Sequence, residues 1–172
     1  MKTVDHYTFQ ALDNYPYSLM DTIESLDYAL AYDKTNVTAL CLYGRVYSEQ
    51  LENYEQAISY FQDALASDVG AVAVYPYFID ALILYNEWDE AERLISFALT
   101  LKGINRYTIL LRYVHLMEVR GDWKAAMEGI KKLTLASVSN NESEIERLKQ
   151  RIKTKQSLAK EKPMKKGKNK KK

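Results

Sequence analysis

Histidine and cysteine, the residue types that most often bind metals or act as nucleophiles, are rare in this chain. His6 and His115 are the only histidines and lie 109 residues apart, so no metal-ligand spacing exists. Cys41 is the single cysteine. It could act as a nucleophile, but we favour a small side chain packed between helices. Gly103 and Gly121 are isolated glycines of the kind that ends helices, and no phosphate-binding loop is present. The sequence therefore predicts no enzyme, no metal and no cofactor.

Lysines gather at the C-terminal end. Residues 160–172 hold eight lysines and one glutamate, a charge of +7, and because the whole chain carries +1, residues 1–159 carry −6. A lysine-rich tail can neutralise phosphates and bind nucleic acid weakly and without sequence preference. The tail has no aromatic residues or arginines, so a solubilising tail, or one that folds back on the acidic body, is the alternative. We expect residues 163–172 to be disordered because they have nothing to bury.

Apolar and small residues recur at helical spacing between residues 36 and 68. Two helices are predicted there, with stripes formed by Leu40, Tyr43, Gly44 and Tyr47 in the first and Ala57, Phe61, Ala64 and Leu65 in the second. A glycine inside a helix is unfavourable, so Gly44 indicates a close approach of the two helices, where we expect the small Ala57 to face it. The tyrosines on this spacing are predicted to pack within the repeat.

The same two-helix unit returns twice. Its stripes are Tyr75, Phe78, Ile79 and Leu82 before Trp88, Ala91, Ile95 and Ala98, then Leu110, Tyr113, Val114 and Met117 before Trp123, Ala126, Ile130 and Leu133. Ala57 and Ala91 are 34 residues apart, and Ala91 and Ala126 are 35 apart. With this period the chain resembles the tetratricopeptide-repeat (TPR) family over roughly residues 4–135. The later units depart from the first in two ways. Ile79 and Val114 stand at the repeat position that Gly44 has in the first of these units. The interval from Tyr47 to Ala57 is 10 residues, whereas the corresponding intervals in the later units are 9.

The resemblance implies an all-α protein, an α-solenoid of antiparallel helical hairpins in a right-handed superhelix with a C-terminal capping helix. We expect about four hairpins in residues 1–135, the first of them degenerate, followed by a linker and capping helix in 136–162 and the tail in 163–172. The narrow apolar stripe of Ile145, Leu148 and Ile152 suits a capping helix with a polar outer face. Pro76 predicts that its helix begins near Tyr75 or is distorted before it.

In this family the faces of the first helices that turn away from their partners line a concave groove, which holds segments of other proteins. Positions off the apolar stripes are Cys41, Leu42, Arg45, Ser48 and Glu49, then Tyr77, Asp80, Ile83 and Leu84, then Leu111, Arg112, His115 and Glu118. The candidate groove consists of Arg45, Glu49, Tyr77, Asp80, Leu84, Arg112 and His115. The lysine and asparagine clamp that one subclass uses for chaperone C-termini is not matched, since Cys41 and Arg45 stand at those positions.

The two arginines of this groove, Arg45 and Arg112, allow two interpretations, which differ in whether they bind a partner or pair within the chain. Arg45 and Arg112 can each form forked hydrogen bonds to a carboxylate, so the preferred ligand would be an extended or helical segment with an acidic residue beside apolar anchors. Alternatively, both arginines pair within the chain with Glu49, Asp80 or Glu118 as weak surface bridges.

Three function classes follow from these patterns. The first is a protein-interaction module or scaffold with a protein or peptide partner, in which a homo-oligomer is an option. The second is an RNA- or ribosome-associated adaptor that acts through the lysine-rich tail, and the third is a small TPR-type chaperone for a secreted protein. The single cysteine, the absence of a signal-peptide pattern and the lack of a membrane-spanning segment predict a soluble cytoplasmic protein.

Overall fold

The structure, a computed structural model, describes residues 5–138 and 141–160. Within these residues the chain is helical and forms no strand, which confirms the predicted all-α class. The α-helices are α1 (His6–Asn14), α2 (Leu19–Tyr32), α3 (Val37–Arg45), α4 (Tyr54–Ser67), α5 (Tyr75–Leu84), α6 (Trp88–Ala98), α7 (Arg106–Arg120), α8 (Trp123–Ala136) and α9 (Glu142–Lys160). A π-helical turn, η1 (Val46–Gln50), follows α3 directly. The disorder predicted for residues 163–172 lies outside the described residues.

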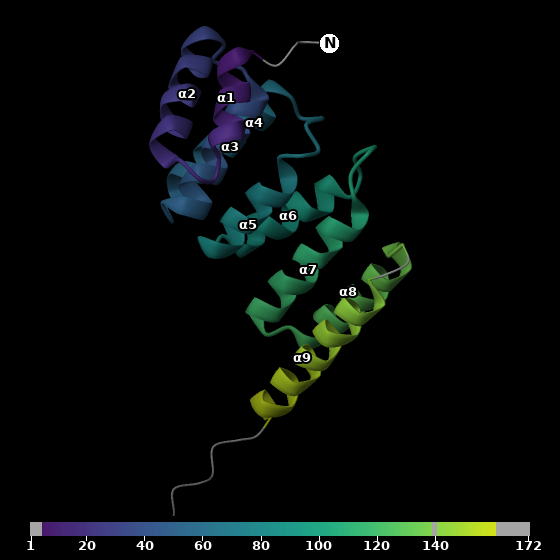
Figure 1. Cartoon of the computed structure of the whole chain (residues 1–172). Coiled ribbons are helices and arrows are strands. Elements are labelled where there is room, and N and C mark those ends of the chain that lie inside the picture. Colours follow the sequence, from purple (N-terminus) through teal and green to yellow (C-terminus); the bar gives the residue numbers. More distant parts are fainter. Residues whose placement is uncertain (1–4, 139–140, 161–172) are drawn as a thin grey trace, which may run out of the picture.

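Consecutive helices pack on one another along the whole described chain. The pairs are α1 with α2, α3 with α4, α5 with α6 and α7 with α8, each pair contacts the next, and α9 packs on α8. First helices of neighbouring pairs also touch, namely α1 with α3, α3 with α5 and α5 with α7. Figure 1 shows α1 and α2 at one end of the molecule and α9 at the other. This order of packing is consistent with a helical repeat.

Asparagine and aspartate side chains begin five of these helices. Each accepts a hydrogen bond from the backbone N–H three residues further on, which satisfies a donor that the first turn leaves unpaired. The capping residues are Asp5, Asn36, Asn53, Asn105 and Asp122. Helix α5 begins at Tyr75 as expected, with Pro76 in its first turn, where the missing N–H has no helical partner.

The small residues of the second helices lie at the centre of the core. Ala57, Ala91 and Ala126 have no exposed surface. The buried residues form a larger cluster that runs from α3 to α9 and a smaller one formed by α1, α2 and α3. Leu30, Tyr47 and Tyr60 are partly buried residues that pack against both clusters, so the two clusters adjoin.

Gly44 marks a close approach, but its neighbour is not the one predicted. A Cβ atom at Gly44 would lie 2.5 Å from Cε1 of Phe61, and the nearest contacts are all to this ring. The residue closest to Gly44 is therefore Phe61 and not the expected Ala57. Phe61 is fully buried in α4 and fills the space that a side chain on α3 would need. Gly129 has the same role on α8, where a Cβ would lie 2.8 Å from Cγ2 of Val114.

The longer interval between Tyr47 and Ala57 has a structural counterpart in η1. The Leu51 N–H donates to the Val46 carbonyl at 3.2 Å, which is the i→i+5 bond of a π-helix. The extra residue is thus absorbed at the end of the first helix before the turn into α4. None of the helices in the described ranges has both the length and the apolar composition needed to cross a membrane.

Candidate functional site

A cavity of about 350 Å³ opens on the face formed by η1, α5 and α7. Its lining residues are Ser48 and Glu49 from η1, Tyr77, Asp80, Ala81, Ile83 and Leu84 from α5, and His115 from α7. Five of the seven candidate groove residues are among them, and they come from three different elements. We call this space the first-helix cavity. Its size is within the range of about 300–1,000 Å³ that is typical of ligand pockets.

Arg45 lies beside the first-helix cavity, held between two aromatic rings. Its Cζ is 4.7 Å from the ring centroid of Tyr15 and 4.4 Å from that of Tyr77. Its Nε donates to Oε1 of Glu49 at 3.0 Å, and the Tyr15 hydroxyl donates to Oε2 of the same carboxylate at 2.5 Å. Burial raises the pKa of Glu49, but the hydrogen bonds from Arg45 and Tyr15 outweigh it and hold the pKa below its ordinary value. Glu49 is therefore ionised and already paired.

Arg112 is likewise engaged within the chain. Its Nη2 donates to Oδ2 of Asp80 at 2.6 Å, its Nε to the Pro76 carbonyl at 2.8 Å, and its Nη1 to the Thr108 carbonyl at 3.1 Å. Burial raises the pKa of Asp80 and outweighs the opposing effect of Arg112. The structure thus agrees with the second of the two interpretations: Arg45 pairs with Glu49, and Arg112 pairs with Asp80.

Leu84, His115 and Glu49 are the exposed members of the cavity. Leu84 is 53% exposed, whereas Ile83 beside it is 4% exposed and packs in the core. Leu42, another off-stripe residue, is 2% exposed and also belongs to the core. The helical period placed Leu42 and Ile83 off the stripe, but contacts from neighbouring helices cover them.

Glu118 is buried and turned toward the last helix instead of the cavity. Its side chain is 3% exposed. Oε1 and Oε2 accept a forked pair of hydrogen bonds from Arg151 at 2.9 and 2.7 Å, and Lys155 Nζ lies 2.8 Å from Oε1. Burial raises the pKa of Glu118, but the hydrogen bonds from Arg151 and Lys155 outweigh it and lower the pKa. This carboxylate fixes α9 on α7.

These contacts form a series along the first helices, which we call the first-helix bridges. Its members are Tyr15 to Glu49, Arg45 to Tyr77, Asp80 to Arg112, and Glu118 to Arg151. They join the turn after α1 to η1, α3 to α5, α5 to α7, and α7 to α9. Each joins residues more than thirty positions apart, and of the four only the pair of Asp80 and Arg112 was among the pairings that the sequence suggested. Tyr15 in particular lies in the turn after α1 and was not expected at the site.

Cys41 and the tyrosines behave as packing residues. Cys41 is partly buried, and burial raises the pKa of its thiol to about 11, so the thiol stays protonated near neutral pH. The rings of Tyr43, Tyr47 and Tyr60 stack on one another, with the Tyr43 and Tyr60 centroids 4.7 Å apart. Among the described residues, no group of three or more His, Cys, Asp and Glu side chains could hold a metal ion.

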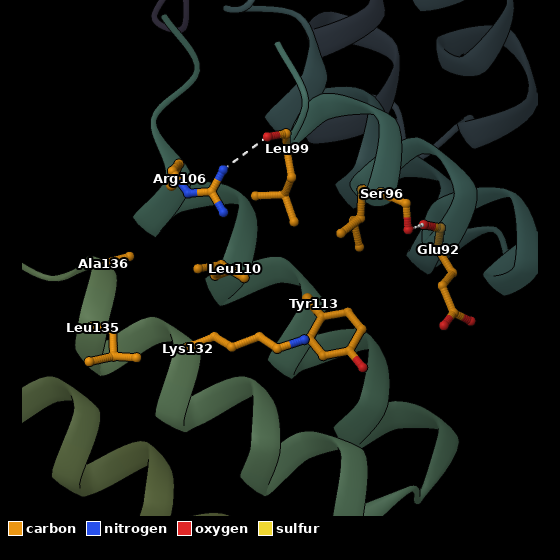
Figure 2. A pocket seen from close by; sticks show the side chains of 10 residues that line it. Glu92, Ser96, Leu99, Arg106, Leu110, Tyr113, Lys132, Leu135 and Ala136 are labelled. Carbon is orange, nitrogen blue, oxygen red and sulfur yellow. Dashed lines mark hydrogen bonds between the residues drawn. The ribbon is translucent and has the colours of Figure 1, made fainter. Parts of the chain in front are cut away.

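A second and larger space, which the sequence did not indicate, lies between α6 and α8 with α7 as its floor (Figure 2). We call it the α6–α8 cleft. It measures about 640 Å³, and its lining residues are Glu92, Ile95, Ser96, Leu99, Arg106, Leu110, Tyr113, Lys132, Leu135 and Ala136. The helical period could not reveal it, because it forms where three helices cross.

No protein-family model matches this chain, and no curated protein matches it.

Proposed function

We propose that this protein is a non-catalytic protein-interaction module of the cytoplasm, a TPR-like array of helical hairpins that binds a segment of a partner protein in the first-helix cavity. One observation carries the proposal. Glu49, Tyr77, Asp80, Leu84 and His115, selected as groove residues by their positions in the repeat, line one cavity although they belong to three elements. A right-handed superhelix would place successive first helices on one concave side and make this cavity part of a longer groove.

The chemistry of the cavity defines the partner segment. Leu84 supplies exposed apolar surface. Tyr77 supplies a flat ring, over which the Arg45 guanidinium lies. Because Arg45 and Arg112 are paired, an acidic partner residue would have to displace Glu49 or Asp80. We therefore propose a partner segment that carries an apolar anchor next to a lysine or arginine, instead of the acidic segment expected from the sequence.

Asp80 provides the acceptor for that cation. Its Oδ2 accepts from Arg112, whereas its Oδ1 accepts no hydrogen bond within the described residues. Burial raises the pKa of this carboxyl group, so a second cation beside it would stabilise the ionised form. The Leu84 side chain lies one helical turn further along α5, which suits an apolar anchor next to the basic residue of the partner.

Site-directed photo-crosslinking tests the proposal. A photoreactive phenylalanine analogue at position 84 should capture a partner protein in the native cell, whereas the same group at position 158 should not. Leu158 is a matched control, because it is 61% exposed and lies on α9, away from the cavity. The captured partner should bind Leu84→Asp at least about tenfold more weakly than the parent, while Leu158→Asp binds normally. Equal capture at both positions would refute a role for the cavity.

A further inference from the structure

Two cations of the α6–α8 cleft, Arg106 and Lys132, have no carboxylate partner within the described residues. In the same part of the chain five of the seven arginines form ion pairs, namely Arg45, Arg93, Arg112, Arg120 and Arg151, whereas Arg106 and Arg147 form none. Arg106 at the edge of the cleft forms no ion pair within the described residues. Its Nη1 donates to the Leu99 carbonyl at 2.9 Å, and this neutral partner leaves the positive charge uncompensated.

Lys132 supplies a second uncompensated charge on the other flank. Its Nζ lies 5.9 Å from the ring centroid of Tyr113, a cation–π contact that leaves room for an anion. Figure 2 shows its side chain extending from α8 toward Tyr113, with Leu110 between it and Arg106. No carboxylate accepts from Lys132 in the part of the chain that the structure describes.

The one carboxylate of the cleft does not offset these charges. Glu92 accepts a hydrogen bond from Arg120 at 2.5 Å, and Arg120 also bonds Asp89 at 2.6 Å. Glu92 is therefore paired within α6 and α7, although Arg120 is shared between two carboxylates. The cleft therefore combines two available cations with apolar lining residues, of which Ile95 on α6 is 1% and Leu110 on α7 is 4% exposed.

We propose that the α6–α8 cleft binds an acidic amphipathic helix of a partner protein. Charge complementarity selects an acidic occupant, because carboxylates beside Arg106 and Lys132 would form the ion pairs that the chain leaves open. The shape favours a helix, since an apolar trough between two helices accepts side chains spaced at i, i+3 or i+4, and i+7. The floor residues Arg106 and Tyr113 are seven positions apart on α7, about two helical turns.

The rim favours a protein over a small anionic molecule. Leu135 lines the cleft and is 89% exposed, so apolar surface continues beyond the cavity, where a small ligand would not cover it. The lysine-rich residues 160–172 of this chain have the wrong sign of charge for this site. The surface is separate from the first-helix cavity, for which we propose a basic partner segment.

A displayed library of helical peptides tests the proposal. Peptides of about 15 residues, with leucine at i, i+4 and i+7 and with glutamate, lysine or alanine randomised at the flanking positions, are selected on the full-length protein. Each round includes counter-selection on the double variant Arg106→Glu, Lys132→Glu. We expect the selected peptides to be rich in glutamate, to bind more weakly as salt increases, and to lose at least about tenfold in affinity for the double variant.

Matched variants separate this site from the other surfaces. Lys124→Glu with Arg147→Glu makes the same charge change at exposed positions of α8 and α9, and should leave peptide affinity within about twofold of the parent. Leu84→Asp should also bind the acidic peptide normally, so failure of the first-helix cavity and failure of the cleft are distinguishable. Selection of lysine-rich peptides, or of none, would overturn the proposal. Binding of dodecanoate without any acidic peptide would overturn it too, in favour of a small amphiphile.

Discussion

The first-helix face and the α6–α8 cleft contain the same kinds of charged residue but use them in different ways. On the first-helix face, Arg112 and Arg151 each reach a carboxylate on a neighbouring hairpin element, and Arg45 stacks on the next first helix. In the cleft, Arg106 and Lys132 stay without a carboxylate. Charges on the first face hold consecutive helices together, whereas charges in the cleft contribute little to the fold.

The difference follows from helix spacing. First helices of neighbouring pairs touch one another, so a side chain of ordinary length can bridge them. Helices α6 and α8 are separated by α7, and the space between them is the cleft. Lys132 on α8 finds no carboxylate across that distance, and Arg106, at the start of α7, donates to the Leu99 carbonyl. We therefore expect stability to depend on the first-helix bridges and binding to depend on the cleft.

The largest effect on stability should come from Glu118→Ala. The change removes the forked hydrogen bonds from Arg151 and the contact with Lys155, and with them the attachment of α9. Both cations are about half exposed and stay hydrated, so we expect a loss of about 2 kcal/mol in the free energy of unfolding. Urea denaturation followed by circular dichroism measures it. Glu128→Ala, at an exposed position of α8, should be nearly neutral. Equal stability of the two variants would contradict the bridge.

The same carboxylate should make stability depend on pH. The pKa of Glu118 is lowered in the fold, so its contribution is fully present above its ordinary value of 4.5 and is lost as the pH falls through the folded pKa. The difference in unfolding free energy between the parent and Glu118→Gln should thus be greatest near neutral pH and shrink below about pH 4.5. A difference that stays constant down to the acid transition would show that the charge of Glu118 does not matter.

A smaller effect is expected for Arg112→Ala. It removes hydrogen bonds to Asp80, Pro76 and Thr108 and leaves the partly buried Asp80 without its cation. We expect a loss of about 1–2 kcal/mol. A double-mutant cycle with Asp80→Ala should give a coupling energy of about 0.5–1 kcal/mol, since the pair is partly screened by solvent. Strictly additive effects would mean that the two side chains act independently.

The smallest effect should come from the cleft. Arg106→Ala and Lys132→Ala together should change the free energy of unfolding by no more than about 0.5 kcal/mol, because neither residue has a carboxylate partner. A loss as large as that of Arg112→Ala would remove the contrast between the two regions and would assign the cleft charges to the fold.

The sequence revealed the class of fold and much of the first-helix cavity. Apolar spacing is a property of single helices, and it identified which side of α5 carries Tyr77, Asp80 and Leu84. It could not choose the partners of Arg45 and Arg112, because pairing depends on the distance between helices. It also named Ala57 instead of Phe61 as the nearest neighbour of Gly44, since that choice depends on how α4 packs on α3. The α6–α8 cleft left no periodic signal at all.

The π-helical turn limits how far the repeats are interchangeable. In a regular array, each unit contacts only its neighbours and could in principle be duplicated or exchanged. Glu49 lies within η1, and there its carboxylate meets both Tyr15 of the first unit and Arg45 of its own. The third and fourth units have no extra residue in the corresponding interval. The unit containing η1 is therefore matched to the hairpin before it, so exchanging that unit alone would break the contact of Glu49 with Tyr15.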